Sequence, residues 1–194
     1  GFDRFERDEN LLFDPAGTVI DVNGAFAPAT GHYNSVDGSP EHVGIGEDVW
    51  IGSLRIKVTP TAGLSCLASL TQPFGTALDF KDGWSRADLV TGQRLRVTEI
   101  GASCGYAIPT ATGVFKPLAG LSYEQLRFSQ DRMFPDGIPT RALTMESGTY
   151  SWRAGLGYRH TQSGIQASLV YYSAARFDVD GILTLPTAGG DRFD

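Results

Sequence analysis

The sequence contains one segment that matches a catalytic pattern. Gly101-Ala102-Ser103-Cys104-Gly105 fits the G-x-S-x-G arrangement of a serine nucleophile. That arrangement requires a strand-to-helix turn, with an acid and a histidine further along the chain. Here the segment lies inside an alternating pattern typical of a strand, so we interpret its small residues as allowing close strand packing. We therefore expect no enzyme activity. An acyl hydrolase that pairs Ser103 with His160 is the weakest alternative.

Metal and cofactor patterns are incomplete. His32, His42 and His160 lie in expected loops or turns, and no pair has the spacing of metal ligands. Gly44-Ile45-Gly46 precedes a strand rather than a helix, which argues against dinucleotide binding. Asp178-Val179-Asp180-Gly181 lacks the rest of a calcium loop. We expect neither a metal nor a cofactor.

The two cysteines fall on consecutive long strands that would pair in a meander. Cys66 and Cys104 fit neither a disulfide-rich scaffold nor a four-ligand zinc site. A disulfide between them is compatible with an oxidising compartment. The alternative is two small apolar side chains that face lipid.

Five cations fall on polar faces of expected strands, where a hydrated barrel interior would accept them. On a lipid-facing surface near mid-membrane, such a charge costs about 2–4 kcal/mol. We expect Arg153 to contact a ligand carboxylate, although pairing with Asp or Glu across the barrel is the commoner role. The five are Arg55, Lys57, Arg127, Arg153 and Arg159.

The loop Met133-Phe134-Pro135-Asp136-Gly137-Ile138 is apolar for an exposed segment. It is predicted either to receive an apolar substrate, with Met133 and Phe134 as contacts, or to pack within the loop.

Alternation with a period of two residues dominates the chain. From Trp50 to Val58, apolar residues alternate with mostly polar ones, as in a strand between two unlike media. Near Glu99 and Ile100 the pattern changes phase, which predicts a bulge there. The predicted strands are Thr18–Pro28, Asp48–Val58, Leu64–Leu78, Arg94–Ile108, Val114–Arg127, Thr149–Arg159 and Ile165–Val179.

Short turns alternate with long connections. Three polar turns close at Gly63, Gly113 and Gly164, and the longer connections cover 29–43, 79–91 and 129–148. Short turns at one end and long loops at the other are typical of an outer-membrane β-barrel. Several strands match the length of about 9–11 residues that a tilted spanning strand needs. A soluble β-sandwich would show similar alternation.

Composition excludes two other classes. With 16 Lys and Arg against 22 Asp and Glu, the net charge is −6, which argues against nucleic-acid binding. The sequence has no apolar run approaching the ~18 residues of a spanning helix, whereas a barrel strand gives only a weak hydropathy signal.

We expect one all-β domain over residues 1–194, an antiparallel up-and-down transmembrane β-barrel. Residues 1–16 form an N-terminal segment, 17–180 the strands, and 181–194 a loop or the start of a missing part. We count seven or eight strands. A single-chain bacterial barrel has an even number of at least eight, so the first part of a larger barrel is favoured over a small closed one.

Three segments together resemble the FadL-like family of outer-membrane transporters for fatty acids and hydrocarbons. They are Gly1-Phe2-Asp3-Arg4 with Asn10-Leu11-Leu12-Phe13-Asp14-Pro15, then Ser69 to Phe80, then Tyr150 to Tyr158 followed by Gln166 to Ser173. Their order and spacing match, so the resemblance covers nearly the whole chain.

The resemblance implies a 14-stranded barrel in the bacterial outer membrane that carries hydrophobic molecules such as long-chain fatty acids by passive diffusion. A kink in the third strand of better-known members opens the wall sideways. Phe74, an aromatic residue near the end of an expected strand, is a further expected ligand contact. The sequence departs from the family in having too little chain before Leu11 for a full N-terminal hatch and in lacking the C-terminal half. The expected partners are a hydrophobic small molecule and membrane lipid; a scaffold for envelope proteins is the alternative.

Overall fold

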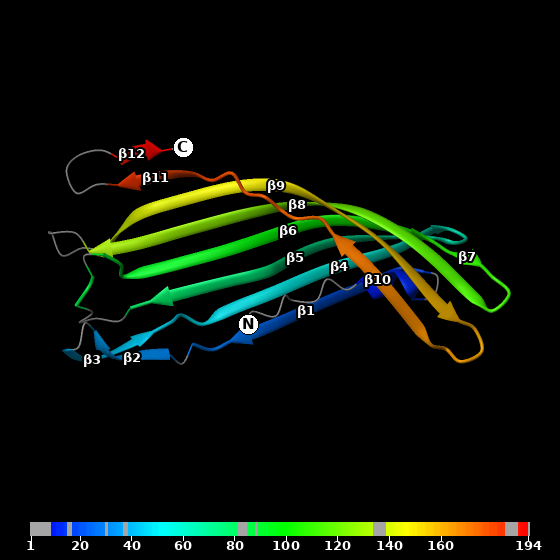
Figure 1. Cartoon of the computed structure of the whole chain (residues 1–194), viewed down its shortest axis with the longest axis horizontal. Helices are drawn as coiled ribbons and strands as arrows, with labels where there is room; N and C mark the ends of the chain where they lie inside the picture. The colour runs from blue at the N-terminus through cyan, green and yellow to red at the C-terminus, as the bar shows by residue number, and fades with distance from the viewer. Residues whose placement is uncertain are drawn as a thin grey trace.

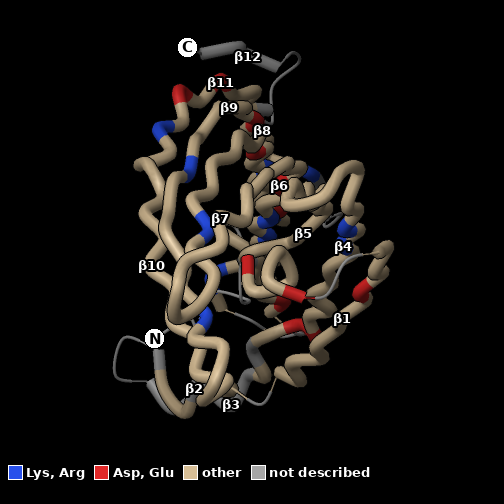
Figure 2. Tube along the Cα trace, turned by 90° about the vertical axis from the view of Figure 1, so that its right-hand side faces the viewer, with Lys and Arg blue, Asp and Glu red and all other residues tan. Residues whose placement is uncertain are grey.

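The computed structural model describes residues 9–14, 17–29, 31–36, 39–80, 85–87, 89–133, 139–184 and 190–193. They form one strongly curled antiparallel sheet with the shape of half a barrel, and a small separate hairpin (Figures 1 and 2). The predicted all-β, antiparallel, barrel-like fold is confirmed. Within these residues, no helix combines the length and the apolar character that crossing a membrane would require.

The elements follow one another along the chain with short turns at one end of the sheet. They are the 3-10 helix η1 (Glu9–Phe13) and the strands β1 (Val19–Ala27), β2 (Gly31–Val36), β3 (Ser39–Ile45), β4 (Val49–Thr61), β5 (Leu64–Asp79), β6 (Gly92–Tyr106), β7 (Ile108–Pro109), β8 (Gly113–Met133), β9 (Pro139–His160), β10 (Gln166–Tyr172), β11 (Asp180–Thr184) and β12 (Gly190–Phe193).

The large sheet is a meander. Its strand order is β1-β4-β5-β6-β8-β9-β11-β12, with β10 also on β9 and β7 on β8, while β2 and β3 pair with each other in a separate sheet. The turns after β4, β7 and β9 lie together on the right in Figure 1. Gly63 and Gly164 in two of these turns have φ of 88° and 69°, a left-handed conformation that glycine adopts without strain. The alternation of short turns and longer connections therefore correctly predicts the up-and-down topology.

Three predicted boundaries differ from the structure. The connection expected over 29–43 instead contains β2 and most of β3, which pair antiparallel. Much of the connection expected over 129–148 is strand, because β8 and β9 pair as far as Met133 and Pro139. The strand expected over Ile165–Val179 is shorter, because β10 ends at Tyr172 and 173–179 are not strand; β11 occupies part of the segment expected as a loop or as the start of a missing part. Polar residues in these segments hid their pairing, because alternation is weak where both faces are hydrated.

The predicted bulge lies on a neighbouring strand. β6 pairs with β8 without a register shift from Gly92 to Gly105. The irregularity is in β5, where Gln72 and Pro73 form the register shift between Thr71 and Phe74 opposite β6. Proline cannot donate to a β-ladder and is tolerated at bulges. The apparent change of phase in β6 comes from polar residues on its outer face, chiefly Arg94 and Arg96, both exposed.

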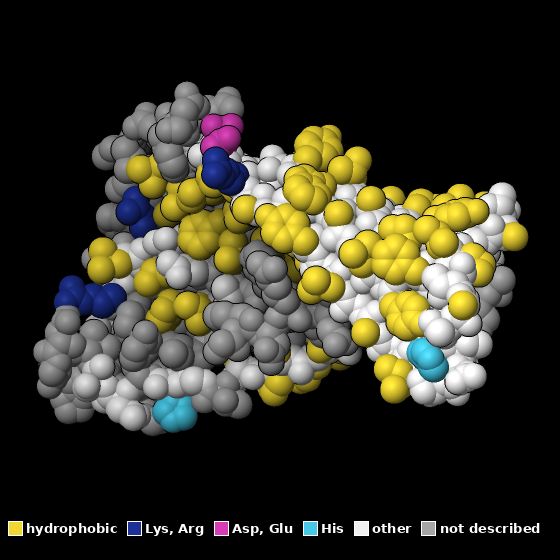
Figure 3. Space-filling view, turned by 45° about the vertical axis from the view of Figure 1, so that its right-hand side comes forward, with side chains coloured by type: hydrophobic (Ala, Val, Ile, Leu, Met, Phe, Trp, Pro, Cys, Tyr) yellow, Lys and Arg dark blue, Asp and Glu magenta, His cyan; other side chains and the backbone are white. Residues whose placement is uncertain are grey.

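The two faces of the curled sheet differ in chemistry. The outer face exposes large apolar side chains over much of its surface (Figure 3), including Trp50, Leu121, Tyr150 and Leu169, each at least 68% exposed. The inner face buries charged and hydroxyl side chains, including Arg55, Lys57, Glu99, Lys116, Glu124 and Arg153. This is the reverse of the usual distribution in a protein surrounded by water.

A small apolar cluster on the inner face holds η1. Leu12 and Phe13 of η1 pack with Leu67 of β5 and Leu118 of β8, all at most 5% exposed. Leu67 interrupts the polar side of its strand, and its contact with η1 explains this exception to the alternation. The Phe13 ring lies where a Cβ at position 157 would stand, so Gly157 makes room for it.

Candidate functional site: the buried polar face and a break in the wall

The inner face is organised around Arg153 of β9. Its Nη1 lies 2.9 Å from Glu9 Oε1 of η1 and 3.4 Å from Glu99 Oε1 of β6. All three side chains are at most 5% exposed. Such a buried arrangement is stable only when the opposite charges remain together, because each carries a large desolvation cost.

Glycines on the neighbouring strands let the Arg153 side chain lie across the sheet. A Cβ at Gly101 of β6 would overlap the Arg153 Nη2, and one at Gly120 of β8 would come within 2.9 Å of its Nε. The glycine that opens the G-x-S-x-G segment thus makes room for a buried arginine. The segment itself lies in the middle of β6, with no helix after it.

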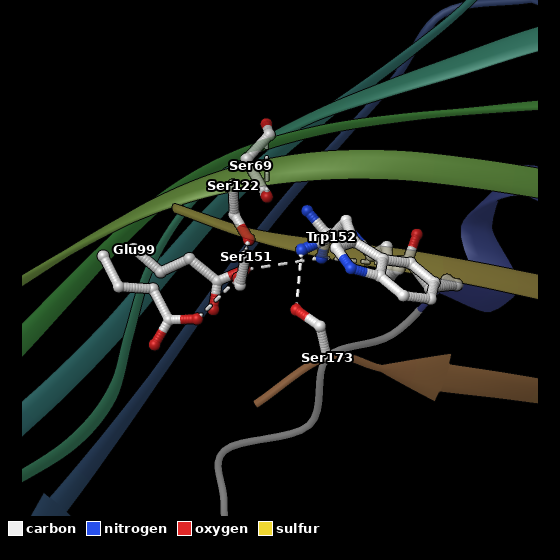
Figure 4. A network of polar contacts seen from close by, with 10 residues as sticks. Ser69, Glu99, Ser122, Ser151, Trp152 and Ser173 are labelled. Carbon is white, nitrogen blue, oxygen red and sulfur yellow. Dashed lines mark hydrogen bonds and ion pairs between the residues drawn. The ribbon is translucent and has the colours of Figure 1, made fainter. Parts of the chain in front are cut away.

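A hydroxyl network lies beside this ion pair. Ser122 Oγ and Ser151 Oγ are 2.8 Å apart, and Ser151 Oγ donates a hydrogen bond of 2.8 Å to Glu124 Oε1. Figure 4 shows Ser122 and Ser151 on adjacent strands close to Glu99. On the outward side of the same strand, Trp152 N donates to Ser173 Oγ at 2.9 Å. Inward polar and outward apolar residues therefore alternate along β9.

Two buried lysines satisfy backbone carbonyls at the C-terminal end of η1. Lys57 Nζ donates to Asp14 O at 2.8 Å, and Lys116 Nζ donates to Leu12 O. The ammonium of Lys116 also lies 5.4 Å from the centre of the Phe13 ring. Cations are favourable at a helix C-terminus, where carbonyls have no partner within the helix. η1 is therefore held by the Glu9 carboxylate at its start and by two lysines at its end.

Burial raises the pKa of Glu9 above its ordinary value, and the nearby Arg153 guanidinium opposes this only in part. Desolvation of the carboxylate is the larger effect. Glu9 is thus a buried acid whose neutral form is favoured more in the docked segment than in water.

The wall of the sheet is interrupted between β4 and β5. The two strands pair from Ser53 and Thr71 toward their turn, and beyond this point 49–52 pair with β1 alone. On the β5 side, 74–79 pair with β6 alone. The strands approach again where Glu47 N donates to Ala77 O at 3.4 Å. A pocket of about 230 Å³ lies between them, lined by Val49, Trp50, Gln72, Gly75 and several further residues including Arg94 and Arg96.

This interruption was not predicted as a site, although Pro73 within an alternating segment was a signal for it. The bulge in β5 lies beside the stretch of β4 that does not pair with β5, so the two strands are joined by fewer hydrogen bonds here than toward their turn. Phe74 was expected as a ligand contact. Its backbone lies in this segment, opposite Val97 of β6. Its side chain lies outside the described residues.

The expected ligand contacts are not brought together. The guanidinium of Arg153 is buried on the inner face and paired with two carboxylates. Met133 ends β8 at the far end of the sheet, and Phe134 lies outside the described residues. The inward placement predicted for Arg127 is wrong: it is 61% exposed on the outer face and lies 3.5 Å from Glu146. Its strand alternates without interruption, and residue 127 follows Leu121 and Tyr123 on the outward side.

Cys66 and Cys104 lie directly opposite each other in the β5–β6 ladder and are joined by a disulfide. Cys104 is on the exposed outer face of β6. The disulfide joins β5 to β6 between the β4–β5 turn and the break in the wall.

Ser103 and His160 are far apart. Ser103 is in register with Gly120 and Arg153, whereas His160 is seven residues further along β9, roughly 23 Å at 3.3–3.4 Å per residue. His160 Nδ1 lies instead 3.0 Å from Ser163 Oγ in the following turn. Among the described residues, no group of three or more His, Cys, Asp or Glu is arranged to hold a metal ion.

Comparison with known proteins gives no match, either to a protein-family model or to a curated protein. The function is therefore inferred from the two faces of the sheet, the buried ion pair and the break in the wall.

Proposed function

We propose that this protein is an outer-membrane barrel protein, similar to the FadL-like family, that lets hydrophobic molecules such as long-chain fatty acids cross the membrane by passive diffusion. The observation that carries the proposal is the reversed chemistry of the sheet, with exposed apolar side chains outside and buried charges inside. Lipid around the sheet would bury the apolar face, and a polar interior is typical of membrane barrels.

The length of the apolar band supports this location. On β8, the outward aromatic residues Phe115 and Tyr123 are separated by eight residues, about 27 Å along a strand and less across a membrane when the strand tilts. The apolar band of known membrane barrels is about 25 Å tall and is bordered by aromatic residues. Tyr123 and Tyr150 stack on the outer face at one border, with ring centroids 5.1 Å apart.

The break between β4 and β5 is the proposed route for the substrate. Apolar residues such as Trp50 and Leu95 line it together with charged ones, and the bulged β5 does not pair with β4 there, so a hydrophobic molecule could leave sideways into the surrounding lipid layer. Arg153 is the proposed contact for a carboxylate head group, which would compete with the Glu9 carboxylate for the same guanidinium. No energy source is required.

The test is uptake of radiolabelled oleate by cells that lack the protein and by the same cells supplied with it. We expect slower uptake without the protein, and restored uptake with it. The variant Gly75→Trp fills the break, where a Cβ already has Gln72 and Leu95 atoms within 3.4 Å. The matched control Ala119→Trp adds the same side chain to the outer face of β8, away from the break.

We expect Gly75→Trp to slow uptake several-fold and Ala119→Trp to leave it unchanged. Equal rates with and without the protein would contradict the transport function. A normal rate in Gly75→Trp, together with slow uptake in cells lacking the protein, would contradict only the sideways route.

A further inference from the structure

The apolar band on the outer face ends in a row of charged residues at the end opposite the short turns. Successive cross-strand rows over β6, β8 and β9 change from apolar to polar to charged. The rows are Ile100–Tyr123–Tyr150, then Thr98–Gln125–Gly148, then Arg96–Arg127–Glu146. In Figure 3 the Lys and Arg side chains gather toward the left, while hydrophobic side chains continue to the right. The charged row stands where a surrounding lipid layer would place its head groups.

Two arginines face each other directly in this row. Arg96 and Arg127 are ladder partners on neighbouring strands, and both are exposed. Like charges at directly opposed positions destabilise a sheet. Arg94 adds a third guanidinium two residues along the same face of β6. An anion between the arginines would remove this repulsion.

Two of the three guanidinium groups pair with carboxylates among the described residues. Arg127 pairs with Glu146 at 3.5 Å, and Arg94 pairs with Glu47. Asp48, also close by, accepts a hydrogen bond from Ala29 N at 2.9 Å. For Arg96, no ion pair or hydrogen bond is recorded within the part of the chain that the structure describes.

Arg96 also lines the pocket at the break in the wall. Arg94 and Arg96 share this pocket of about 230 Å³ with Glu47, Asp48 and Trp50, and Trp50 is 70% exposed. Because Glu47 pairs with Arg94, Arg96 is the guanidinium beside the exposed indole that is left for an anionic head group, and the indole offers an apolar surface for its chains. Arginine binds phosphate oxygens in a planar, two-pronged geometry.

We propose that Arg96, flanked by Arg94 and Arg127, binds the phosphate of a lipid of the surrounding layer, whose acyl chains lie along Trp50 and the apolar band. The site is distinct from the buried Arg153 and from the transported molecule. It rests on the proposed membrane location of the sheet, but not on any transport activity. The bound lipid would border the break between β4 and β5.

The test is native mass spectrometry of the detergent-purified protein with two lipids that differ only in the phosphate. Dioleoyl phosphatidic acid carries the phosphate, and dioleoylglycerol does not. We expect a one-to-one complex with the phosphatidic acid, weakened about fivefold by Arg96→Gln. The matched control is Arg141→Gln, which removes an exposed arginine paired with Asp131 at 2.9 Å in the same end of the sheet.

The proposal is overturned if Arg96→Gln binds phosphatidic acid as tightly as the unaltered protein, or if Arg141→Gln weakens binding equally. Equal binding of dioleoylglycerol also overturns it, as does an Arg96-dependent complex with oleate but not with phosphatidic acid. These outcomes leave the proposed transport function standing. If the protein instead stays monodisperse without detergent and binds none of the lipids, the membrane location itself fails.

Discussion

The two faces of the sheet differ in what they bury and what they expose. On the inner face, charges that would be costly alone are made stable by geometry, since Arg153 touches two carboxylates and two lysines bind the carbonyls of η1. On the outer face, apolar side chains such as Leu121 and Leu169 have few neighbours within the chain and remain exposed. The Arg153 charge on the inner face is therefore paired within the protein, whereas the apolar side chains of the outer face would be buried only by their surroundings. Substitutions on the inner face should lower the stability of the protein in any solvent, whereas substitutions on the outer face should lower it only in lipid.

The largest expected effect is on the inner face. Arg153→Met leaves Glu9 and Glu99 as buried carboxylates without their common partner. Breaking a buried pair in this way costs about 3–5 kcal/mol. We expect the free energy of unfolding, measured by urea titration in detergent, to fall by that amount.

Arg141→Met is the control, because its pair with Asp131 is exposed and should be worth less than about 1 kcal/mol. Equal stabilities of the two variants would show that the inner network does not hold the sheet together.

The next effect belongs to the outer face and depends on depth. Ala119 lies on the outward side of β8 midway between Phe115 and Tyr123, so Ala119→Arg would place a charge near the middle of the apolar band. We expect a loss of about 2–4 kcal/mol in bilayers. Gln125→Arg, beyond the tyrosine border, should cost about 0–1 kcal/mol. Folding titrations of both variants in lipid vesicles measure the difference; the same cost at both positions would contradict the proposed band.

The smallest effect is the pH dependence of η1 docking. Because the pKa of Glu9 is raised in the folded protein, docked η1 binds more protons than released η1 between the ordinary pKa of 4.5 and the folded value. Docking is therefore strongest below this window and weakens as the pH rises through it.

Hydrogen exchange of the amides in η1, followed from pH 4 upward after correction for intrinsic rates, measures this change. Glu9→Gln should abolish the dependence. Protection of η1 that increases with pH would reverse the predicted sign.

The sequence predicts the meander well because the evidence for it is local. Alternation over Trp50–Val58 and turns ending in glycine depend on neighbouring residues only, and they match β4 and the turn ends of the sheet. The same alternation correctly places Arg55, Lys57 and Arg153 inward. It fails for Arg127, because the polar rim of the outer face resembles an inner face in composition.

The pairing of side chains depends on contacts between distant parts of the chain. Glu9 and Arg153 are 144 residues apart in the sequence, and nothing local to either indicates the partner. The break beside β5 likewise depends on β4 losing its partner, which the single residue Pro73 only suggests. The disulfide requires the register of β5 against β6, which alternation leaves undetermined.

If lipid acyl chains cover the outer face, quenching of the Trp152 indole should detect them. Trp152 is half exposed on the outer face of β9 and stacks on Tyr171 at 5.4 Å between ring centroids. With Trp50 and Trp84 replaced by Phe, the protein in vesicles should lose its fluorescence to brominated acyl chains and be little affected by aqueous iodide. Strong quenching by iodide, with none from brominated lipid, would show that water rather than lipid covers the outer face.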